Sequence, residues 1–184
     1  MNVTFITGNQ NKADFLAKYL GHDIPHKKLE LDELQSLNLR RITEYKVKQA
    51  YEIIRGPVLV EDIGFTIGAL GKLPGPFIKW FIEEMGYDGL CRLADPDPAR
   101  AAVTSVCYAY FDGRTLEFFE GELGGTVPDH PRGSDGFGWN CVFIPNGQDK
   151  TNAEMSESET EKYSLRTTTV YPKLKEFLSS LDKQ

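Results

Sequence analysis

Apolar positions along the chain occur in short runs and helical periods, a pattern typical of an α/β protein. Val3 to Ile6 is a short β-rich run that ends at Thr7-Gly8-Asn9. Lys12 to Leu20 then carries apolar residues at helical spacing, which predicts a strand, a loop and a helix in this order. Thr43 to Ile54 repeats the helical period and predicts a second helix, which Gly56-Pro57 stops.

The next apolar run, Val58-Leu59-Val60, predicts a fully buried strand. Glu61 and Asp62 follow it directly, so we expect this strand to deliver two carboxylates at its carboxyl end. Ligands of α/β sheets bind outside the carboxyl ends of the strands. The pair is therefore the first candidate for a functional site.

The rest of the chain predicts a mixture of helices and antiparallel strands, so the sheet should contain both parallel and antiparallel pairs. The expected elements are helices over 77–85 and 86–93, a strand pair over 102–111 and 115–124 with a turn at Asp112-Gly113, a long loop over 129–140, a strand over 141–144, a capping box at Ser156 and Glu159, and a last helix over 171–181. The prediction is one α/β domain spanning residues 1–184.

Composition narrows the class of protein. The 184 residues are 40% apolar and suffice for one hydrophobic core. The net charge of −6 disfavours nucleic-acid polymers as partners, whereas a small phosphate ligand remains compatible with a local cluster of lysines or a metal. Cys91, Cys107 and Cys141 form no metal-binding or disulfide pattern, and no leader or membrane span is evident. We expect a cytoplasmic protein without a membrane partner.

The loop Thr7-Gly8-Asn9 with Lys12 lies between a predicted strand and a helix N-terminus, where free N–H groups and a lysine favour an anion. The loop has one glycine and lacks the spacing of a Walker loop. A plain helix entry with Asn9 as N-cap explains the same residues equally well. Local sequence leaves phosphate binding and capping both open.

Adjacent carboxylates such as Glu61 and Asp62 repel each other unless one turns away or a cation joins them. Mg²⁺ takes one or two protein carboxylates and completes its shell with water and phosphate oxygens, so Glu33 is a candidate second ligand beside Asp62. An ordinary exposed turn is the alternative. The role of Glu61 and the number of metal ions stay open.

Two further segments rich in aromatic residues contain candidate ligand-binding side chains. In Leu73-Pro74-Gly75-Pro76-Phe77-Ile78-Lys79-Trp80-Phe81, Lys79 is out of place in an expected buried segment, and it either reaches a phosphate or extends to water. In Phe137-Gly138-Trp139-Asn140 the two aromatic rings either stack on a base or fill the core. The glycines around Phe137 favour a binding loop.

Five motifs in order resemble the inosine triphosphate pyrophosphatase family over nearly the whole chain. They are Thr7-Gly8-Asn9 with Lys12, Gly56-Pro57-Val58-Leu59-Val60-Glu61-Asp62, Leu73 to Phe81, Phe137-Gly138-Trp139, and Ala153-Glu154-Met155. The resemblance implies a homodimer whose subunits have an elongated central mixed sheet flanked by helices, with two lobes and a deep substrate cleft. It also implies Mg²⁺-dependent hydrolysis of non-standard purine nucleoside triphosphates, such as ITP and XTP, to the monophosphate and pyrophosphate.

The resemblance also implies roles for single residues. Asp62 is expected to be catalytic and to bind Mg²⁺ together with Glu33. The remaining expected contacts are Thr7, Gly8, Asn9, Lys12 and Lys79 to phosphates, and Phe137, Trp139, Asn140, Lys162, Ser164 and Arg166 to the base.

Three departures from the family pattern fall on base recognition. Leu165 replaces a histidine, Thr160 stands where a lysine is usual, with Lys162 nearby, and Asn140 replaces a common aspartate. Each lost hydrogen bond weakens discrimination by about 1–3 kcal/mol, so catalysis can persist while base choice changes. A pyrimidine or other modified triphosphate as substrate, or a non-catalytic nucleotide-binding regulator, remains an alternative.

Overall fold

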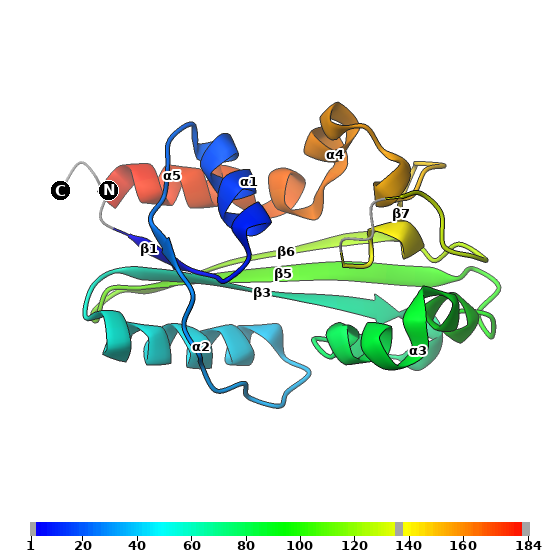
Figure 1. Cartoon of the computed structure of the whole chain (residues 1–184), viewed down its shortest axis with the longest axis horizontal. Helices are drawn as coiled ribbons and strands as arrows, with labels where there is room; N and C mark the ends of the chain where they lie inside the picture. The colour runs from blue at the N-terminus through cyan, green and yellow to red at the C-terminus, as the bar shows by residue number, and fades with distance from the viewer. Residues whose placement is uncertain (1–2, 135–137, 182–184) are drawn as a thin grey trace. The chain divides into compact units, whose positions relative to one another are not determined.

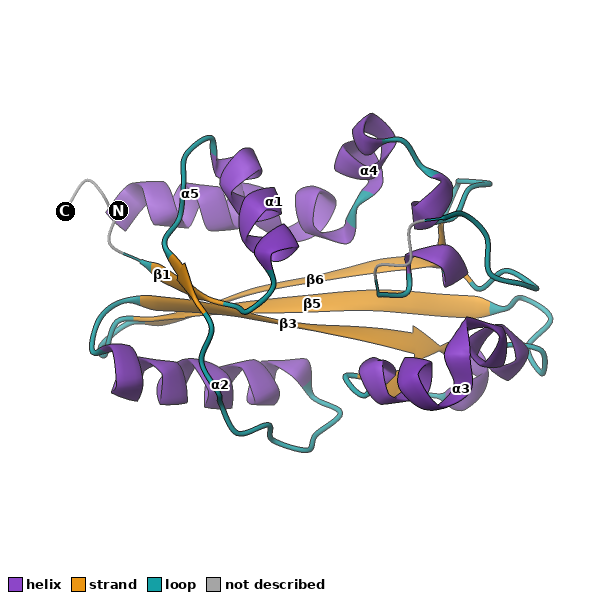
Figure 2. Ribbon diagram, in the orientation of Figure 1, coloured by secondary structure: helices purple, strands orange, loops and turns teal. Residues whose placement is uncertain are grey.

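The computed structural model describes residues 3–134 and 138–181, and its strands form one mixed sheet (Figures 1 and 2). Within this part of the chain the seven strands are β1 (Thr4–Ile6), β2 (His26–Lys27), β3 (Val58–Ile67), β4 (Pro74–Gly75), β5 (Ala101–Phe111), β6 (Leu116–Thr126) and β7 (Ile144–Pro145). Their order is β2-β1-β3-β5-β6-β7, and β4 pairs with β3. β1 is parallel to β2 and β3, whereas β4 and β7 pair antiparallel, so the predicted mixed α/β sheet is confirmed.

Five α-helices accompany the sheet in the described residues: α1 (Gln10–Leu20), α2 (Leu39–Ile54), α3 (Ile78–Leu93), α4 (Glu157–Tyr163) and α5 (Tyr171–Leu181). Each coincides with a predicted helix or cap. The two predicted helices of the third region are joined in α3, where Gly86 has φ 66° and ψ 179° and interrupts the helical geometry. Among these helices none is both long enough and apolar enough to cross a bilayer.

The chain divides into two compact units. Unit 1 comprises Met1–Asp62, Val106–Gly121 and Thr169–Gln184, and unit 2 comprises Ile63–Ser105 and Glu122–Thr168. Strands β3, β5 and β6 each contribute residues to both units. The single domain predicted over residues 1–184 stays a prediction, as do the two lobes and the deep cleft that the resemblance implies.

In unit 1, helices α1 and α5 pack against each other on one face of the strands, and α2 covers the opposite face (Figure 1). The α2 face is filled by apolar side chains that are at most 9% exposed, namely Ile6, Val47, Ala50, Val58, Val60 and Ala109. On the α1 and α5 face, the Tyr19 and Tyr171 rings lie 4.9 Å apart. The buried strand predicted over 58–60 is therefore confirmed, because helices cover both of its faces.

In unit 2 the core forms around Phe65, Phe143 and the helix α3. The Phe65 and Phe143 rings meet edge to face at 5.9 Å, a favoured geometry for aromatic pairs. The strand predicted over 141–144 is wrong in its first half, since Asn140–Val142 is a 3-10 turn in which the Val142 N–H donates to the Trp139 carbonyl at 2.9 Å. Only Ile144–Pro145 pairs with β6.

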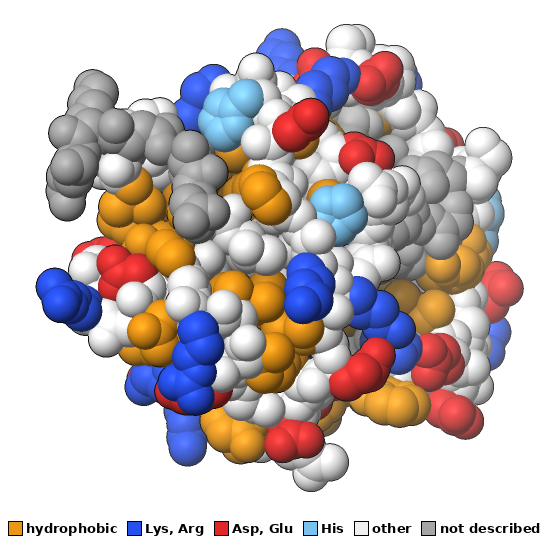
Figure 3. All heavy atoms as spheres, turned by 60° about the vertical axis from the view of Figure 1, so that its left-hand side comes forward, with side chains coloured by type: hydrophobic (Ala, Val, Ile, Leu, Met, Phe, Trp, Pro, Cys, Tyr) orange, Lys and Arg blue, Asp and Glu red, His pale blue; other side chains and the backbone are white. Residues whose placement is uncertain are grey.

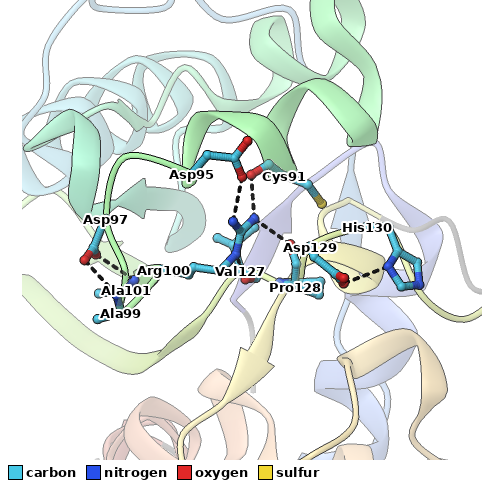
Figure 4. Close-up of polar contacts among 10 residues, drawn as sticks. All are labelled: Cys91, Asp95, Asp97, Ala99, Arg100, Ala101, Val127, Pro128, Asp129 and His130. Atoms are coloured by element: carbon cyan, nitrogen blue, oxygen red, sulfur yellow. Dashed lines mark hydrogen bonds and ion pairs between the residues drawn. The ribbon is translucent and has the colours of Figure 1, made fainter.

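Arg100 holds together several segments of unit 2 (Figure 4). Its guanidinium donates to the carbonyls of Val127, Cys91 and Pro128 at 2.8, 2.6 and 2.8 Å. It also forms an ion pair of 2.6 Å with Asp95. The end of α3 and the chain after β6 are therefore fixed to the residue that precedes β5.

The surface carries charges of both signs. On the face shown in Figure 3, Lys and Arg side chains are interspersed with Asp and Glu side chains and with apolar groups. Where side chains of opposite charge lie close together, they reduce the long-range attraction of that face for a polyanion.

Candidate functional site

The first part of the candidate site is the loop between β1 and α1. The Asn9 side chain accepts a hydrogen bond from the Lys12 N–H at 3.3 Å, and the Asn9 N–H donates to the Thr7 hydroxyl at 3.1 Å. Asn9 is therefore the N-cap of α1, as the capping interpretation predicted. The cap fixes the first turn of the helix and the position from which the Lys12 side chain starts.

Glu61 and Asp62 begin where β1 stops pairing with β3. The parallel register ends at Ile6 opposite Val60, so the two carboxylates follow directly after this pair. β3 itself continues to Ile67, so the prediction that these residues end the strand is wrong. They occupy an internal strand position because each carboxylate contacts a basic side chain there.

The pleat of β3 separates the two carboxylates. Successive residues of a strand point to opposite faces. Glu61 accordingly meets Lys12 of α1, with Nζ and Oε1 3.0 Å apart, whereas Asp62 meets Lys46 of α2, with Nζ and Oδ2 2.8 Å apart. The repulsion expected between adjacent carboxylates is thus relieved by one lysine on each face.

Lys46 also brings Glu33 and Asp62 together. Its Nζ lies 3.1 Å from Glu33 Oε1, and its side chain is 17% exposed. Burial acts to lower the Lys46 pKa, but the charges and hydrogen bonds of Asp62 and Glu33 outweigh it and raise that pKa above the ordinary value. The predicted metal ligands therefore converge on one cation, although they are 29 residues apart in sequence.

The oxygens of Glu33 and Asp62 suit a magnesium ion. Mg²⁺ is bound by one or two protein carboxylates, with water and substrate phosphates as its remaining ligands. Among the described residues no group of three or more His, Cys, Asp and Glu side chains forms a fuller set of ligands. Glu33 Oε1 and Asp62 Oδ2 already contact the Lys46 ammonium, and a metal ion at this position would supply positive charge to the same two oxygens.

The remaining predicted residues belong to unit 2 and are described there by themselves. Lys79 is 72% exposed, lies 3.8 Å from Glu83 and is 5.3 Å from the centre of the Trp80 ring. Pro74, Gly75 and Ile78 are buried, but Lys79 and Trp80 are exposed, Trp80 by 55%, so the expectation of a lysine in a buried segment is wrong. Lys79 extends to the surface because the first turn of α3 has one solvent-facing side.

Trp139 is partly buried and packs on Phe65, with ring centres 5.6 Å apart. Core packing, one of the two alternatives from the sequence, therefore applies to Trp139, although part of its surface stays accessible. The stacking partner predicted at Phe137 lies outside the described residues. Asn140 begins the 3-10 turn that follows.

The predicted base contacts near the C-terminus lie around the end of α4. Lys162 is exposed in the last turn of α4, and the Ser164 hydroxyl bonds to the Thr167 hydroxyl at 2.8 Å. Leu165, which replaces the histidine of the family pattern, is only 8% exposed. Its side chain belongs to the interior, and Arg166 begins the turn of π-helix that leads to α5.

Lys46 and Tyr108 are the residues that the sequence interpretation missed. Lys46 lies four residues from both Ile42 and Ala50, two buried positions of α2, so a lysine on the apolar side of a helix was an available signal. Tyr108 donates a hydrogen bond to Glu61 across 47 residues of sequence. No local pattern indicates that pair.

Comparison with known proteins shows the family and the fold of the chain. A family model described as the Ham1 family matches residues 3–177. The chain is 38% identical over 183 residues to a Schizosaccharomyces pombe protein named inosine triphosphate pyrophosphatase, covering 97% of this chain and 96% of that protein. It is 37% identical over 173 residues to a Methanopyrus kandleri protein named dITP/XTP pyrophosphatase, covering 91% of each.

Solved structures show the same fold. The Ham1 protein of Staphylococcus aureus superposes with a TM-score of 0.81 at 20% identity, covering 97% of this chain and 98% of that one. A HAM1 protein from Coxiella burnetii gives a TM-score of 0.79, also at 20% identity, with 97% and 98% covered. From the family match over residues 3–177 and relatives nearly 40% identical along its length, the chain belongs to the Ham1 family.

Proposed function

We propose that the chain is a Mg²⁺-dependent pyrophosphatase that hydrolyses non-standard purine nucleoside triphosphates to the monophosphate and pyrophosphate. The observation that carries this proposal is the convergence of Glu33 and Asp62 on one cation, Lys46. The names of the relatives support the reaction and the class of substrate. Such an enzyme would remove damaged nucleotides from the cytoplasmic pool.

The reaction breaks one phosphoanhydride bond. A water oxygen attacks the α-phosphorus, the bond from that phosphorus to the bridging oxygen breaks, and pyrophosphate leaves with the electron pair. Asp62 accepts the proton of the attacking water. Mg²⁺ bound by Glu33 and Asp62 would supply charge neutralisation to the phosphates.

The substrate's phosphates carry several negative charges and need fixed donors. We propose that the loop Thr7-Gly8-Asn9, Lys12 and Lys79 supply them. The capped first turn of α1 supports this role, since its free N–H groups and Lys12 favour an anion. Lys79 is 72% exposed and is therefore available to a ligand.

Base recognition is proposed for Phe137, Trp139, Asn140, Lys162, Ser164 and Arg166. The partly accessible Trp139 ring supports stacking. Leu165 is buried and offers no hydrogen bond to a purine keto group. With Leu165 in place of a histidine, the protein should discriminate less well among bases.

Product analysis tests the proposal. Purified protein with Mg²⁺ should release pyrophosphate, and not single phosphate, from ITP and XTP faster than from ordinary triphosphates. Asp62→Asn should lower kcat by about 10²- to 10⁴-fold, because the proton acceptor is lost. Asp32→Asn is the control. It changes an exposed carboxylate next to Glu33 and should keep full activity.

The buried Leu165 favours one second candidate, the same chemistry on a different base. A faster release of pyrophosphate from pyrimidine or other modified triphosphates in the same panel would support it. Tight Mg²⁺-dependent nucleotide binding without hydrolysis would instead indicate a regulator. We also propose a homodimer, which the molar mass measured by light scattering tests.

A further inference from the structure

Glu61 is the most deeply buried carboxylate of the candidate site, and the proposed reaction leaves it unused. Its side chain is 1% exposed, compared with 16% for Asp62 and 18% for Lys12. An ionised carboxylate at such depth is costly unless charged or hydrogen-bonding groups surround it. The groups that contact Glu61 therefore indicate what it does.

Three residues form a chain of hydrogen bonds that ends at Lys12. The Tyr108 hydroxyl donates to Glu61 Oε2, while Glu61 Oε1 accepts from the Lys12 ammonium at 3.0 Å. A phenol has one hydroxyl hydrogen, and that of Tyr108 is engaged by Glu61. The contact of 3.3 Å between the Tyr108 and Tyr171 hydroxyls is therefore donated by Tyr171.

Both tyrosines are held rigidly. Tyr108 on β5 and Tyr171 at the start of α5 are 0% exposed. Their rings lie 5.9 Å apart and pack on Phe5, Phe15 and Tyr19. Neither ring can turn without disturbing this aromatic packing, so the two hydroxyls have fixed positions and Glu61 Oε2 has a fixed donor.

We propose that Tyr171, Tyr108 and Glu61 together position the Lys12 ammonium for the phosphates of the substrate. A free lysine side chain loses rotamer entropy when it is ordered, which weakens its binding to a ligand. The buried carboxylate orders Lys12 before any ligand arrives, while 18% of the side chain stays exposed for contact. This inference rests on the proposed binding of phosphates by Lys12, and Glu61 is a positioning residue that does not touch the substrate.

Tyr108→Phe is the first test, because it removes one oxygen and keeps the ring. A less ordered Lys12 weakens binding of phosphates in the ground state and the transition state alike, which raises KM and leaves kcat nearly unchanged. We expect KM for ITP and the inhibition constant of pyrophosphate to rise about fivefold to tenfold, with kcat within twofold.

Tyr110→Phe is the matched control. Tyr110 lies on the same strand, is 2% exposed, and its hydroxyl donates to a different carboxylate, Asp112, at 3.3 Å. It should leave KM and the pyrophosphate inhibition constant unchanged. Glu61→Gln keeps the shape but removes the charge that orders Lys12, so its KM should exceed that of Tyr108→Phe. Tyr171→Phe should shift KM in the same direction by a smaller factor.

The outcomes separate this proposal from the proposed function. If the wild-type protein releases pyrophosphate but Tyr108→Phe and Tyr171→Phe match Tyr110→Phe in KM, the positioning role is wrong. A fall in kcat with unchanged KM contradicts it as well. If Tyr108→Phe does not fold, the KM values of Tyr171→Phe and Glu61→Gln are compared with that of Tyr110→Phe and decide in the same way. A wild-type protein that leaves all triphosphates intact overturns both proposals.

Discussion

Lys46 stands where two carboxylates need a positive charge. Without it, Glu33 and Asp62 would lose the shared ammonium group that reduces their repulsion. We predict that Lys46→Met lowers the melting temperature in EDTA and that added Mg²⁺ restores most of the loss. Calorimetry with and without MgCl₂ measures this. Lys48→Met, which changes an exposed lysine of the same helix, should melt at the same temperature in both buffers.

The three cysteines should be chemically inert in the folded protein. All three are buried, and burial raises the pKa of Cys91 to about 11 and that of Cys107 to about 12. The thiolate is the reactive form, so almost none is present at pH 8. A thiol reagent such as DTNB should find no fast-reacting group in the native protein and three after denaturation. Rapid native labelling would contradict this burial.

At the scale of single residues, the sequence predicted the groups but only part of their contacts. Asn9 as a cap follows from its place before a helical period, which is local information. Glu33 was named as a partner of Asp62 from the ligand preference of Mg²⁺, and the family resemblance implied the same pair. The bond from Tyr108 to Glu61 joins two elements that meet only in the folded sheet, so no spacing along the chain could indicate it.

Among the elements, α4 depends on its N-terminal cap. Ser156 and Glu159 form the predicted capping box, and Lys150 lies 2.7 Å from Glu159. Hydrogen bonding to the Lys150 side chain, followed by bonds from Ser156, lowers the Glu159 pKa to about 2. A depressed pKa in the folded state stabilises the protein above the ordinary pKa of glutamate, and this contribution is lost as the pH falls towards 2.

We therefore predict that Glu159→Gln makes stability less dependent on pH between about 4.5 and 2. Urea unfolding at several pH values in this range gives the slope. Glu176→Gln, an exposed change in α5, should keep the wild-type slope. If the unfolding free energy of wild type and Glu159→Gln has the same slope against pH, the Glu159 carboxylate does not stabilise the cap as described.

The contacts of Arg100 with neighbouring elements lead to a second prediction. It donates to three carbonyls and pairs with Asp95, whereas a lysine has one nitrogen and cannot reach all four groups. Arg100→Lys should lower the free energy of unfolding by about 2–4 kcal/mol, since buried carbonyls lose their donor. Urea denaturation measures the loss. Arg92→Lys, on the exposed side of α3, should cost less than about 0.5 kcal/mol.

Helices and turns were predictable where their signals are local, whereas the end of β3 and the start of the strand predicted over 141–144 were not. The caps at Asn9 and Ser156 and the turn at Asp112 have short-range causes, and the structure confirms them. The end of β3 was predicted too early because Glu61 and Asp62 resemble a solvated turn. Ion pairs with Lys12 and Lys46 allow these charges inside a strand, and those partners are invisible in a local window.

For the whole molecule, ligand binding should raise stability. A ligand at 100 times its dissociation constant stabilises the folded state by about 2.7 kcal/mol. In a chain of 184 residues this corresponds to roughly 5 to 10 °C in melting temperature. We expect that shift with a non-hydrolysable ITP analogue and Mg²⁺, and a much smaller one when EDTA replaces Mg²⁺. Equal shifts in both buffers would argue against a metal-dependent site.

The mixed sheet of the molecule could be predicted because its strands carry distinct patterns, an apolar run at Val58–Val60 and a hairpin turn at Asp112. The boundaries of its two units could not be predicted, although the family resemblance implied two lobes. Each unit combines segments from distant parts of the chain, and β3, β5 and β6 belong to both, so the pattern of apolar residues has no break at the boundaries.

The contact of α1 with α5 bears on how the chain is made. Helix α1 begins at Gln10 and α5 at Tyr171, so the first helix leaves the ribosome long before the element that covers it. Until then, apolar side chains of α1 such as Leu16, which is buried in the folded protein, are partly exposed to solvent. We expect unit 1 to complete its folding only after α5 has been synthesised, and chaperones that bind exposed apolar segments to bind the nascent protein there first.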